Sequence, residues 1–503
     1  TTSYGDSPYQ SFSAIAGNTH LIDFDLLTQM GLLKESDYAS VNFGDDPTSV
    51  DYERIFYARR PILETAVKNF LANQSLQADF NHFEKNNRLW LDDFAEFMAI
   101  KEHFGNQALQ KWDDKKAVAR DPKTLEKYRT MLADQIQYFK VTQYFFFKQW
   151  SELKHYANQK GIKIIGDMPI YVAADSVEVW TKPELFQLDK ERNPLFVAGV
   201  PADQFSATGQ LWGNPLYDWE EHKKQGYAWW IHRIEESFKI YDVLRIDHFK
   251  GFSDYWQVDG KADIAKYGSW QPGPGYDLFK AVKEQLGDLP IIAEDLGNID
   301  DKARKLLADC NYPGMKILQF GFEDVSGKSL DSPHYCIPHS IVYTGTHDND
   351  VTNGWYNGLT EQQQQYTNDY THRSEDESIC QAMIRQLFAT VSNTAIATMQ
   401  DVLDLPASSR MNVPSTIGGN WQWRMQQSDL TQDKKDFLAK MTTLYQRANQ
   451  EKTMIKFSTF VKNETNKSLE QLSDKETYIQ LLNYVKTLSA DKPKNTGKRK
   501  VYY

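Results

Sequence analysis

The stretch Tyr241–Phe252 reads Y-D-V-L-R-I-D-H-F-K-G-F and decides the fold that we expect. Its first half is a short apolar run interrupted only by Arg245, and glycine punctuation follows at Gly251. A run this short, rich in branched residues and bounded by turn signals, predicts a buried strand. Arg245 and Asp247 are two residues apart, so both side chains point to the same face of that strand. An arginine beside a carboxylate keeps it ionised and oriented, as a nucleophile requires, although a structural ion pair explains this one motif equally well.

Three other stretches repeat the pattern of an apolar strand that ends in a carboxylate. They are I-K-I-I-G-D at 162–167, L-P-I-I-A-E-D at 289–295 and S-I-V-Y-T-G-T-H-D-N-D at 340–350. Helix-length sequence separates them, and in a barrel of alternating strands and helices the catalytic groups lie where the strands end. The sequence therefore predicts an α/β fold, a (β/α)8 TIM barrel, with an acidic active site at the strand ends.

Composition excludes several classes of protein. The 503 residues are 41% hydrophobic and 25% charged, which is ordinary for a globular protein, and no apolar run is long enough to cross a bilayer. The net charge of −11 argues against nucleic acid or an anionic membrane as a partner. No metal cluster or phosphate-binding loop is visible in the sequence, so we expect no cofactor. Three widely spaced cysteines suit reduced thiols in the cytoplasm; they are Cys310, Cys336 and Cys380.

The strand ends R-I-D-H-F, A-E-D-L-G and T-H-D-N-D, in this order, resemble the catalytic strand ends of the α-amylase clan of retaining glycosidases. The flanking segments narrow the resemblance to the 4-α-glucanotransferases, also called amylomaltases or disproportionating enzymes, of glycoside hydrolase family 77. These segments are G-D-S-P-Y-Q-S-F-S-A at 5–14, G-D-M-P-I-Y-V-A at 166–173, G-V-P-A-D-Q-F at 199–205 and G-Q-L-W-G-N-P-L-Y-D-W at 209–219. The resemblance runs from about residue 4 to about residue 449.

The resemblance implies a retaining double displacement, in which two carboxyl groups roughly 5–5.5 Å apart flank the scissile bond. It makes Asp247 the nucleophile, Glu294 the general acid/base, and Asp348 a third carboxylate that holds sugar hydroxyls. An apolar wall and nearby negative charge are expected to keep Glu294 protonated before the attack. Asp167 is expected either to bind a hydroxyl or to be an ion-pair partner of Arg245. The predicted substrate-binding residues are Tyr9, Asp167, Trp212, Asn214, Arg245 and His347.

The substrates implied by the resemblance are malto-oligosaccharides and glucans derived from starch or glycogen. The chain is 13% aromatic, and sugars present flat C–H faces that stack well on aromatic rings. A glucan 4-hydroxyl that attacks the glycosyl-enzyme gives transfer, whereas water gives hydrolysis. The three carboxylates do not separate these outcomes, so the transferase prediction depends on the family-specific flanks. An α-glucan hydrolase and an inactive, truncated glucan-binding fragment remain as alternatives.

The resemblance also divides the chain. Residues 1–450 correspond to the barrel, with a helical subdomain at about 21–110 and an active-site loop at 199–230. In similar proteins a first strand and helix precede the G-D-S-P-Y motif, and both are missing from this sequence, which is either a fragment or begins late. If the strand is absent from the protein, we expect the barrel to have an open seam. Residues 451–503 do not fit the pattern and resemble the N-terminal end of a glycogen or maltodextrin phosphorylase. This suggests that two neighbouring proteins have been joined, either by natural fusion or by assembly of a sequence fragment.

Several stretches carry local predictions that the structure can test. Residues 276–286 predict a helix, 313–322 an apolar strand, 252–275 a loop and 375–402 a helical region. Residues 125–159 predict one or two amphipathic helices. Their expected buried stripe is Phe139, Tyr144, Phe145, Phe146, Trp150 and Leu153.

Overall fold

The computed structural model describes residues 2, 4–202, 206–297, 299–447 and 500–501. It divides into two compact units, one made of Thr1–Gly314 and Met411–Gln426, the other of Met315–Arg410 and Gln427–Tyr503. Most of the predicted phosphorylase-like tail, 451–503, lies outside the described residues, apart from 500–501. No helix in the described part of the chain combines the length and the apolar character needed to span a membrane.

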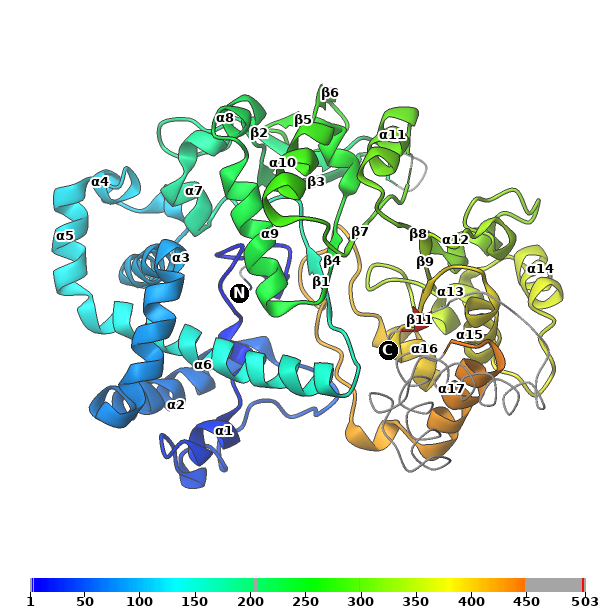
Figure 1. Ribbon diagram of the computed structural model, residues 1–503, viewed down its shortest axis with the longest axis horizontal. Helices are drawn as coiled ribbons and strands as arrows, with labels where there is room; N and C mark the ends of the chain where they lie inside the picture. The colour runs from blue at the N-terminus through cyan, green and yellow to red at the C-terminus, as the bar shows by residue number, and fades with distance from the viewer. Residues whose placement is uncertain (1, 3, 203–205, 298, 448–499, 502–503) are drawn as a thin grey trace, which may run out of the picture. The chain divides into compact units, whose positions relative to one another are not determined.

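The first unit contains a parallel sheet built from three of the predicted strands (Figure 1). The strand order is β1-β4-β7, with β1 at Ile165–Met168, β4 at Val243–Ile246 and β7 at Ile291–Ala293. The register places Asp167 opposite Arg245, and Arg245 opposite Ile292. The three strands are mostly buried, as parallel strands covered by helices usually are. The predicted strands are therefore confirmed, and their C-terminal ends lie side by side.

Helices connect these strands and pack against them. Helix α9 (Ala228–Ile240) precedes β4 and packs on β1 and β4, and α10 (Tyr276–Leu286) precedes β7. Helix α11 (Asp301–Cys310) follows β7 and packs on α10, which in turn contacts α9. The helix predicted at 276–286 is confirmed. Parallel strands joined by helices give the mixed α/β architecture that the sequence predicted.

The N-terminal part of the first unit is mainly helical. Three long helices, α2, α3 and α6, pack together around Phe70, whose ring contacts those of Phe80, Tyr144 and Phe145. Whether this part forms a separate subdomain stays a prediction. The helices are α1 (Phe24–Gln29), α2 (Tyr52–Ala72), α3 (Gln77–His103), α4 (Lys115–Val118), α5 (Pro122–Met131), α6 (Ala133–Gln159) and α7 (Val177–Thr181).

The buried stripe predicted within residues 125–159 is confirmed at the centre of α6, but the burial predicted near the end of this helix is wrong. The four aromatic residues from Phe139 to Phe146 are buried, but Leu153 is 53% exposed. The last turns of α6 are held to residues 240–242 through Trp150, Lys154 and Asn158. Residues spaced by four lie on one face of a helix, and Leu153 lies roughly 100° away from that face. Its side chain therefore points to solvent.

The first unit also contains an antiparallel sheet that the sequence did not predict. Its order is β3-β2-β5-β6, with β2 at Phe196–Val200, β3 at Gln210–Pro215, β5 at Asp254–Asp259 and β6 at Gly268–Pro272. The loop predicted at 252–275 is thus wrong, because β5 and β6 form a hairpin stabilised by the cross-strand pair Trp256 and Trp270. Residues 199–230 likewise contain β3 and α8 (Trp219–Lys224).

The second unit has a sheet of order β11-β10-β9-β8, in which β10 runs parallel to β9 and β11. The strand predicted at 313–322 ends early, because residues after Ile317 form a helix, and the helical region predicted at 375–402 is interrupted by β10. Periodicity alone does not separate such short apolar runs into strand and helix. The strands are β8 (Gly314–Ile317), β9 (Ser340–Tyr343), β10 (Thr394–Ile396) and β11 (Lys500–Val501), and the helices are α12 (Leu318–Glu323), α13 (Thr352–Gly358), α14 (Glu361–Thr371), α15 (Ile379–Ala389), α16 (Met399–Leu403) and α17 (Gln432–Leu444).

Candidate active site

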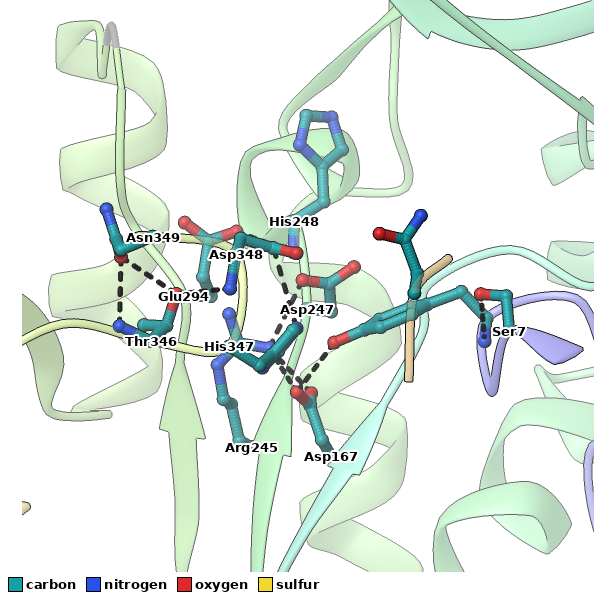
Figure 2. A network of polar contacts seen from close by, with 12 residues as sticks. Ser7, Asp167, Arg245, Asp247, His248, Glu294, Thr346, His347, Asp348 and Asn349 are labelled. Atoms are coloured by element: carbon teal, nitrogen blue, oxygen red, sulfur yellow. Dashed lines mark hydrogen bonds and ion pairs between the residues drawn. The ribbon is translucent and has the colours of Figure 1, made fainter. Parts of the chain in front are cut away.

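Arg245 is the centre of a polar network at the C-terminal edge of the β1-β4-β7 sheet (Figure 2). Its side chain is 8% exposed, and Nη1 donates to both carboxylate oxygens of Asp167, at 2.7 and 2.6 Å, and to Oδ1 of Asp247 at 3.2 Å. The register brings these groups together, because Asp167 lies opposite Arg245 on the neighbouring strand. Burial alone would lower the pKa of Arg245, but the nearby carboxylates, first that of Asp167, raise this pKa well above its usual value.

Asp247 is held in place by both its backbone and its side chain. It follows the last residue of β4, and its N–H donates to the carbonyl of Met168 at 3.0 Å, which ties the turn to β1. Its carboxylate contacts Arg245, yet 24% of the side chain is exposed. A carboxylate that is oriented by an arginine and accessible from solvent has the properties of a nucleophile at carbon.

Asp167 connects Arg245 to the N-terminal G-D-S-P-Y motif. The hydroxyl of Tyr9 donates to Oδ2 of Asp167 at 2.9 Å. The ring of Tyr9 lies beside that of Trp421, with the centroids 5.9 Å apart and the planes tilted by 43°. Asp167 is therefore the ion-pair partner of Arg245, which is one of the two roles that the sequence left open, and it also fixes the hydroxyl of Tyr9.

Glu294 lies directly after β7, and each of its two carboxyl oxygens accepts a backbone hydrogen bond. The N–H of His248 donates to Oε2 at 2.8 Å, and that of Leu296 donates to Oε1 at 2.7 Å. Burial raises the pKa of Glu294, while Arg245 and the two N–H groups lower it, and the net result is a raised pKa. Glu294 therefore keeps its proton to a higher pH than an ordinary glutamic acid, which suits a general acid.

His248 is a member of the site to which the sequence assigned no role. Its left-handed backbone, with φ of 49°, turns the chain after Asp247 so that its N–H reaches Glu294. Its ring meets the ring of Trp212, on β3, nearly at a right angle with the centroids 4.9 Å apart. Burial, and then Lys250, lower the pKa of His248 to about 4, so the ring is neutral at pH 7. The sequence feature that could have indicated a role for His248 is its position directly after the expected nucleophile.

Asn214 has a supporting rather than an open position. It is 6% exposed, its Nδ2 donates to the carbonyl of Val172 at 2.8 Å, and its Oδ1 accepts from Gln10 at 3.2 Å. Gln10 also donates to the carbonyl of Trp212 at 3.3 Å. Both ends of its amide bind protein, and the sugar contact predicted for Asn214 stays a prediction. Gln10, which the sequence did not single out, joins the motif of Tyr9 to strand β3.

His347 and Asp348 lie in the second unit, in the turn after β9 (Figure 2). The backbone N–H and the hydroxyl of Thr346 both donate to Oδ1 of Asn349 at 2.9 Å, which closes the turn. Nε2 of His347 is 3.5 Å from Oδ2 of Asp348, whose side chain is partly exposed. The guanidinium of Arg410 donates to the carbonyl of Asp348 at 2.6 Å.

Asp401 stabilises that turn, and the sequence did not predict a role for it. It is buried, and it accepts from the hydroxyl of Thr344 at 2.6 Å and from the N–H of Thr352 at 2.8 Å, on either side of the turn. Burial raises the pKa of Asp401 despite these hydrogen bonds. Because its partners are about 50 residues away in the sequence, no local pattern marks this aspartate.

One group among the described residues has suitable types and geometry for a metal ion, namely His232, Glu235 and Glu236 on α9. Glu236 already forms an ion pair with Lys239, one helical turn further along. None of these residues contributes to the hydrogen bonds around Arg245 and Glu294 described above. We assign the group no part in the chemistry of the strand ends.

A family model described as 4-alpha-glucanotransferase matches residues 1–433. The chain belongs to the 4-alpha-glucanotransferase family. The 4-alpha-glucanotransferase of Streptococcus pneumoniae is 54% identical over 450 residues, which cover 89% of each chain. That of Clostridium butyricum is 44% identical over 450 residues, 89% of this chain and 91% of the relative.

Solved structures of the family share the fold. The amylomaltase from Streptococcus agalactiae in complex with acarbose superimposes with a TM-score of 0.88 at 59% identity, over 89% of this chain and 90% of that one. The amylomaltase from Corynebacterium glutamicum is only 15% identical, but its TM-score of 0.68, over 87% of this chain and 67% of that one, shows a similar fold. The resemblance predicted from the strand-end motifs and their flanks is therefore confirmed.

The structure brings together most of the residues predicted for the site. The network of the first unit contains Tyr9, Asp167, Arg245, Asp247 and Glu294. Trp212 is next to this network, because its ring contacts the ring of His248. Asn214 is buried and accepts a hydrogen bond from Gln10, and His347 and Asp348 belong to the other unit. Figure 2 draws the strand-end residues with their polar contacts.

Proposed function

We propose that this chain is a 4-alpha-glucanotransferase that moves α-1,4-glucan segments between malto-oligosaccharides, or glucans derived from starch or glycogen, with retention at the anomeric carbon. Family membership carries the reaction class. The amylomaltase complex with acarbose supports a glucan-like substrate. The observation that carries the mechanism is the pair of carboxyl groups at neighbouring strand ends, one bonded to Arg245 and one with a raised pKa.

In the first step, a carboxylate oxygen of Asp247 attacks the anomeric carbon of the donor glucan. The glycosidic C–O bond breaks, and the leaving oxygen takes the proton of Glu294. Arg245 supports this step because it orients Asp247 and carries a fixed positive charge beside it. The raised pKa of Glu294 supports its role as the proton donor.

In the second step, the acceptor's 4-hydroxyl gives its proton to the carboxylate of Glu294 and attacks the glycosyl-enzyme, which releases Asp247. Two inversions give overall retention. Glu294 has to be stable in both protonation states during this cycle. Burial favours the protonated state, and the N–H groups of His248 and Leu296 favour the ionised one, so neither state is strongly disfavoured.

The remaining residues of the site are proposed to bind the donor sugar. The ring of Tyr9, which lies against Trp421 and is fixed by Asp167, is suited to stack on a sugar face. Trp212, whose ring contacts that of His248, is proposed to line the same side of the sugar-binding site as His248. Asp348 and His347 are proposed to hold sugar hydroxyls, with Asp348 as the third carboxylate, and the T-H-D-N-D motif supports this role.

Three further proposals concern the location, the partners and the complete fold. A reducing cytoplasm is the proposed location, supported by the free thiols of Cys310, Cys336 and Cys380. The net charge of −11 supports the proposal that neither a nucleic acid nor an anionic membrane is a partner. A closed barrel of eight strands with a helical insertion at about 21–110 remains our proposal for the complete fold of the family.

Incubation of the purified chain with maltotriose tests the reaction class. Glucose together with maltopentaose and longer glucans, separated by chromatography, is the expected result, because transfer lengthens one product at the expense of another. Hydrolysis alone gives glucose and maltose without any longer product, and that outcome would overturn the proposal. Family membership favours transfer over a hydrolase or an inactive fragment. The matched variants are Asp247→Asn, expected to abolish the longer products, and Asp259→Asn on the surface of β5, expected to retain them.

A further inference from the structure

A tryptophan, a lysine and an aspartate gather beside the network, and the mechanism above uses none of them. Nζ of Lys250 lies 4.5 Å from the ring centroid of Trp270 and 3.2 Å from Oδ2 of Asp300. The indole of Trp270 is 43% exposed, and the carboxylate of Asp300 is also exposed. We refer to these three residues as the Trp270 cluster.

The Trp270 cluster lies on the same side of the sheet as the proposed acid/base. Lys250 is in the turn after β4, two residues beyond His248, whose N–H binds Glu294. Asp300 follows β7, six residues after Glu294, and caps α11 by accepting from the N–H of Ala303 at 2.9 Å. Lys250 and Asp300 therefore each follow one of the strand ends that carry the site, a few residues after Asp247 and Glu294 respectively.

The hairpin that bears Trp270 is held rigidly against the turn that bears Lys250. The N–H of Gly273, directly after β6, donates to the carbonyl of Ser253 at 2.9 Å. A Cβ atom at Gly273 would lie 2.3 Å from the carbonyl oxygen of Phe252, so only glycine permits this close approach. On β6 itself, the ring of Trp270 packs beside that of Trp256, with the centroids 5.3 Å apart. The indole is thus in place before any ligand arrives, which lowers the entropy cost of binding.

The chemistry of the cluster suits a sugar. An exposed indole offers an apolar surface for the C–H face of a glucose unit, and a carboxylate beside an ammonium offers an acceptor and donors for neighbouring hydroxyls. The charges of Lys250 and Asp300 offset each other, so the cluster favours a neutral ligand over an anion or a cation. An apolar partner would leave both charged groups without hydrogen-bonding water, which is costly.

The direction of the reaction decides which part of the glucan reaches the cluster. Glu294 gives its proton to the leaving oxygen, so the leaving glucan and the later acceptor both lie on the side of Glu294, away from the glucose unit bonded to Asp247. We propose that Trp270, Lys250 and Asp300 bind an acceptor-side glucose unit one or more positions beyond the unit whose 4-hydroxyl reacts. This inference depends on the transferase function proposed above.

A donor that needs no acceptor-side leaving sugar separates this role from the rest of catalysis. α-Maltotriosyl fluoride forms the glycosyl-enzyme with loss of fluoride, and glucose or maltotriose is then supplied as the acceptor. Glucose occupies only the reacting position, whereas maltotriose extends beyond it. The quantity to measure is the acceptor KM for maltotriose divided by that for glucose, in the wild-type chain and in Trp270→Ala.

The expected result for Trp270→Ala is a rise in this ratio of about threefold to tenfold, the equivalent of one lost aromatic contact. Lys250→Met is expected to raise the ratio in the same direction, and Trp270→Phe to raise it less than Trp270→Ala. Tyr267→Ala, which removes an exposed aromatic ring just before β6, is the matched control and is expected to leave the ratio unchanged.

An unchanged ratio in Trp270→Ala, with transfer intact in the wild-type chain, overturns the acceptor-side position and leaves the transferase function standing. An equal rise of both KM values also overturns it, because that pattern indicates a general disturbance of the turn at Lys250. Absence of transfer by the wild-type chain to either acceptor overturns the proposed function and this inference together.

Discussion

Replacement of Arg245 by methionine is the most informative change in the proposed site, because it removes a charge and keeps most of the side-chain volume. Arg245 lies within hydrogen-bonding distance of two carboxylates, and its contact with Asp247, at 3.2 Å, is longer than its two contacts with Asp167. A hydrogen bond to a charged group contributes about 1.5–3 kcal/mol. If that contribution is fully expressed in the transition state, its loss lowers kcat/KM about tenfold to 150-fold. The partial exposure of Asp247 places the expected effect in the lower part of this range.

The same variant has a characteristic effect on the pH dependence. Arg245 lowers the pKa of Glu294, so loss of the guanidinium raises this pKa further above its usual value. A general acid with a higher pKa keeps its proton to a higher pH, and the alkaline limb of the pH profile of kcat/KM therefore moves upward. Arg245→Lys retains a positive charge and is expected to move the limb less, although a lysine does not reproduce the contacts of the guanidinium group.

The assay is the initial rate of maltotriose disproportionation over a range of pH, with the folded state of each variant checked by circular dichroism. Arg54→Met is the matched control, because Arg54 pairs with Asp45 at an exposed position and is expected to change kcat/KM by less than about twofold. An alkaline limb that stays at its wild-type pH in Arg245→Met would refute the electrostatic coupling between Arg245 and Glu294. A kcat/KM within twofold of wild type would refute the orienting role of Arg245.

Three further predictions concern the carboxyl groups and the core. Asp247→Asn is expected to lower the rate of glucan transfer by roughly 10⁴-fold or more, measured by chromatography of maltotriose products, and a loss below tenfold would exclude Asp247 as the nucleophile. Glu294→Gln is expected to slow the reaction of maltotriose about 10²- to 10⁴-fold. It is expected to slow the first release of fluoride from α-maltotriosyl fluoride far less, because fluoride leaves without a proton. Equal losses of rate with both donors would contradict the role of Glu294 as the acid. Phe70→Ala is expected to lower the free energy of unfolding of its unit by about 3–5 kcal/mol, because the ring of Phe70 is fully buried and contacts three other rings. Leu89→Ala, at an exposed position, is expected to change this free energy by less than about 0.5 kcal/mol. Similar denaturation midpoints for the two variants would contradict the packing described for α2, α3 and α6.

Local sequence determined a large part of this protein. The apolar runs at β1, β4, β7 and β9 have the length and branched composition of buried strands, so their positions follow from residue type and turn signals alone. The carboxylates that end these strands, and the long motifs around them, were sufficient to identify the family. Short apolar runs without such a context were ambiguous, and for that reason β10 and the end of β8 were predicted incorrectly.

The tertiary structure decided how the residues act on one another. Asp167 and Arg245 are 78 residues apart and meet because β1 and β4 pair in one register, in which a shift of one residue would turn either side chain to the other face. Burial raises the pKa of Glu294 and N–H groups from two segments lower it, and the hydrogen bonds of Asn214 come from Val172 and Gln10. Residue type and periodicity are local properties, so sequence alone can place a carboxylate at the end of a strand. The charge, orientation and exposure of that carboxylate depend on segments brought beside it by folding, and only the three-dimensional structure contains them.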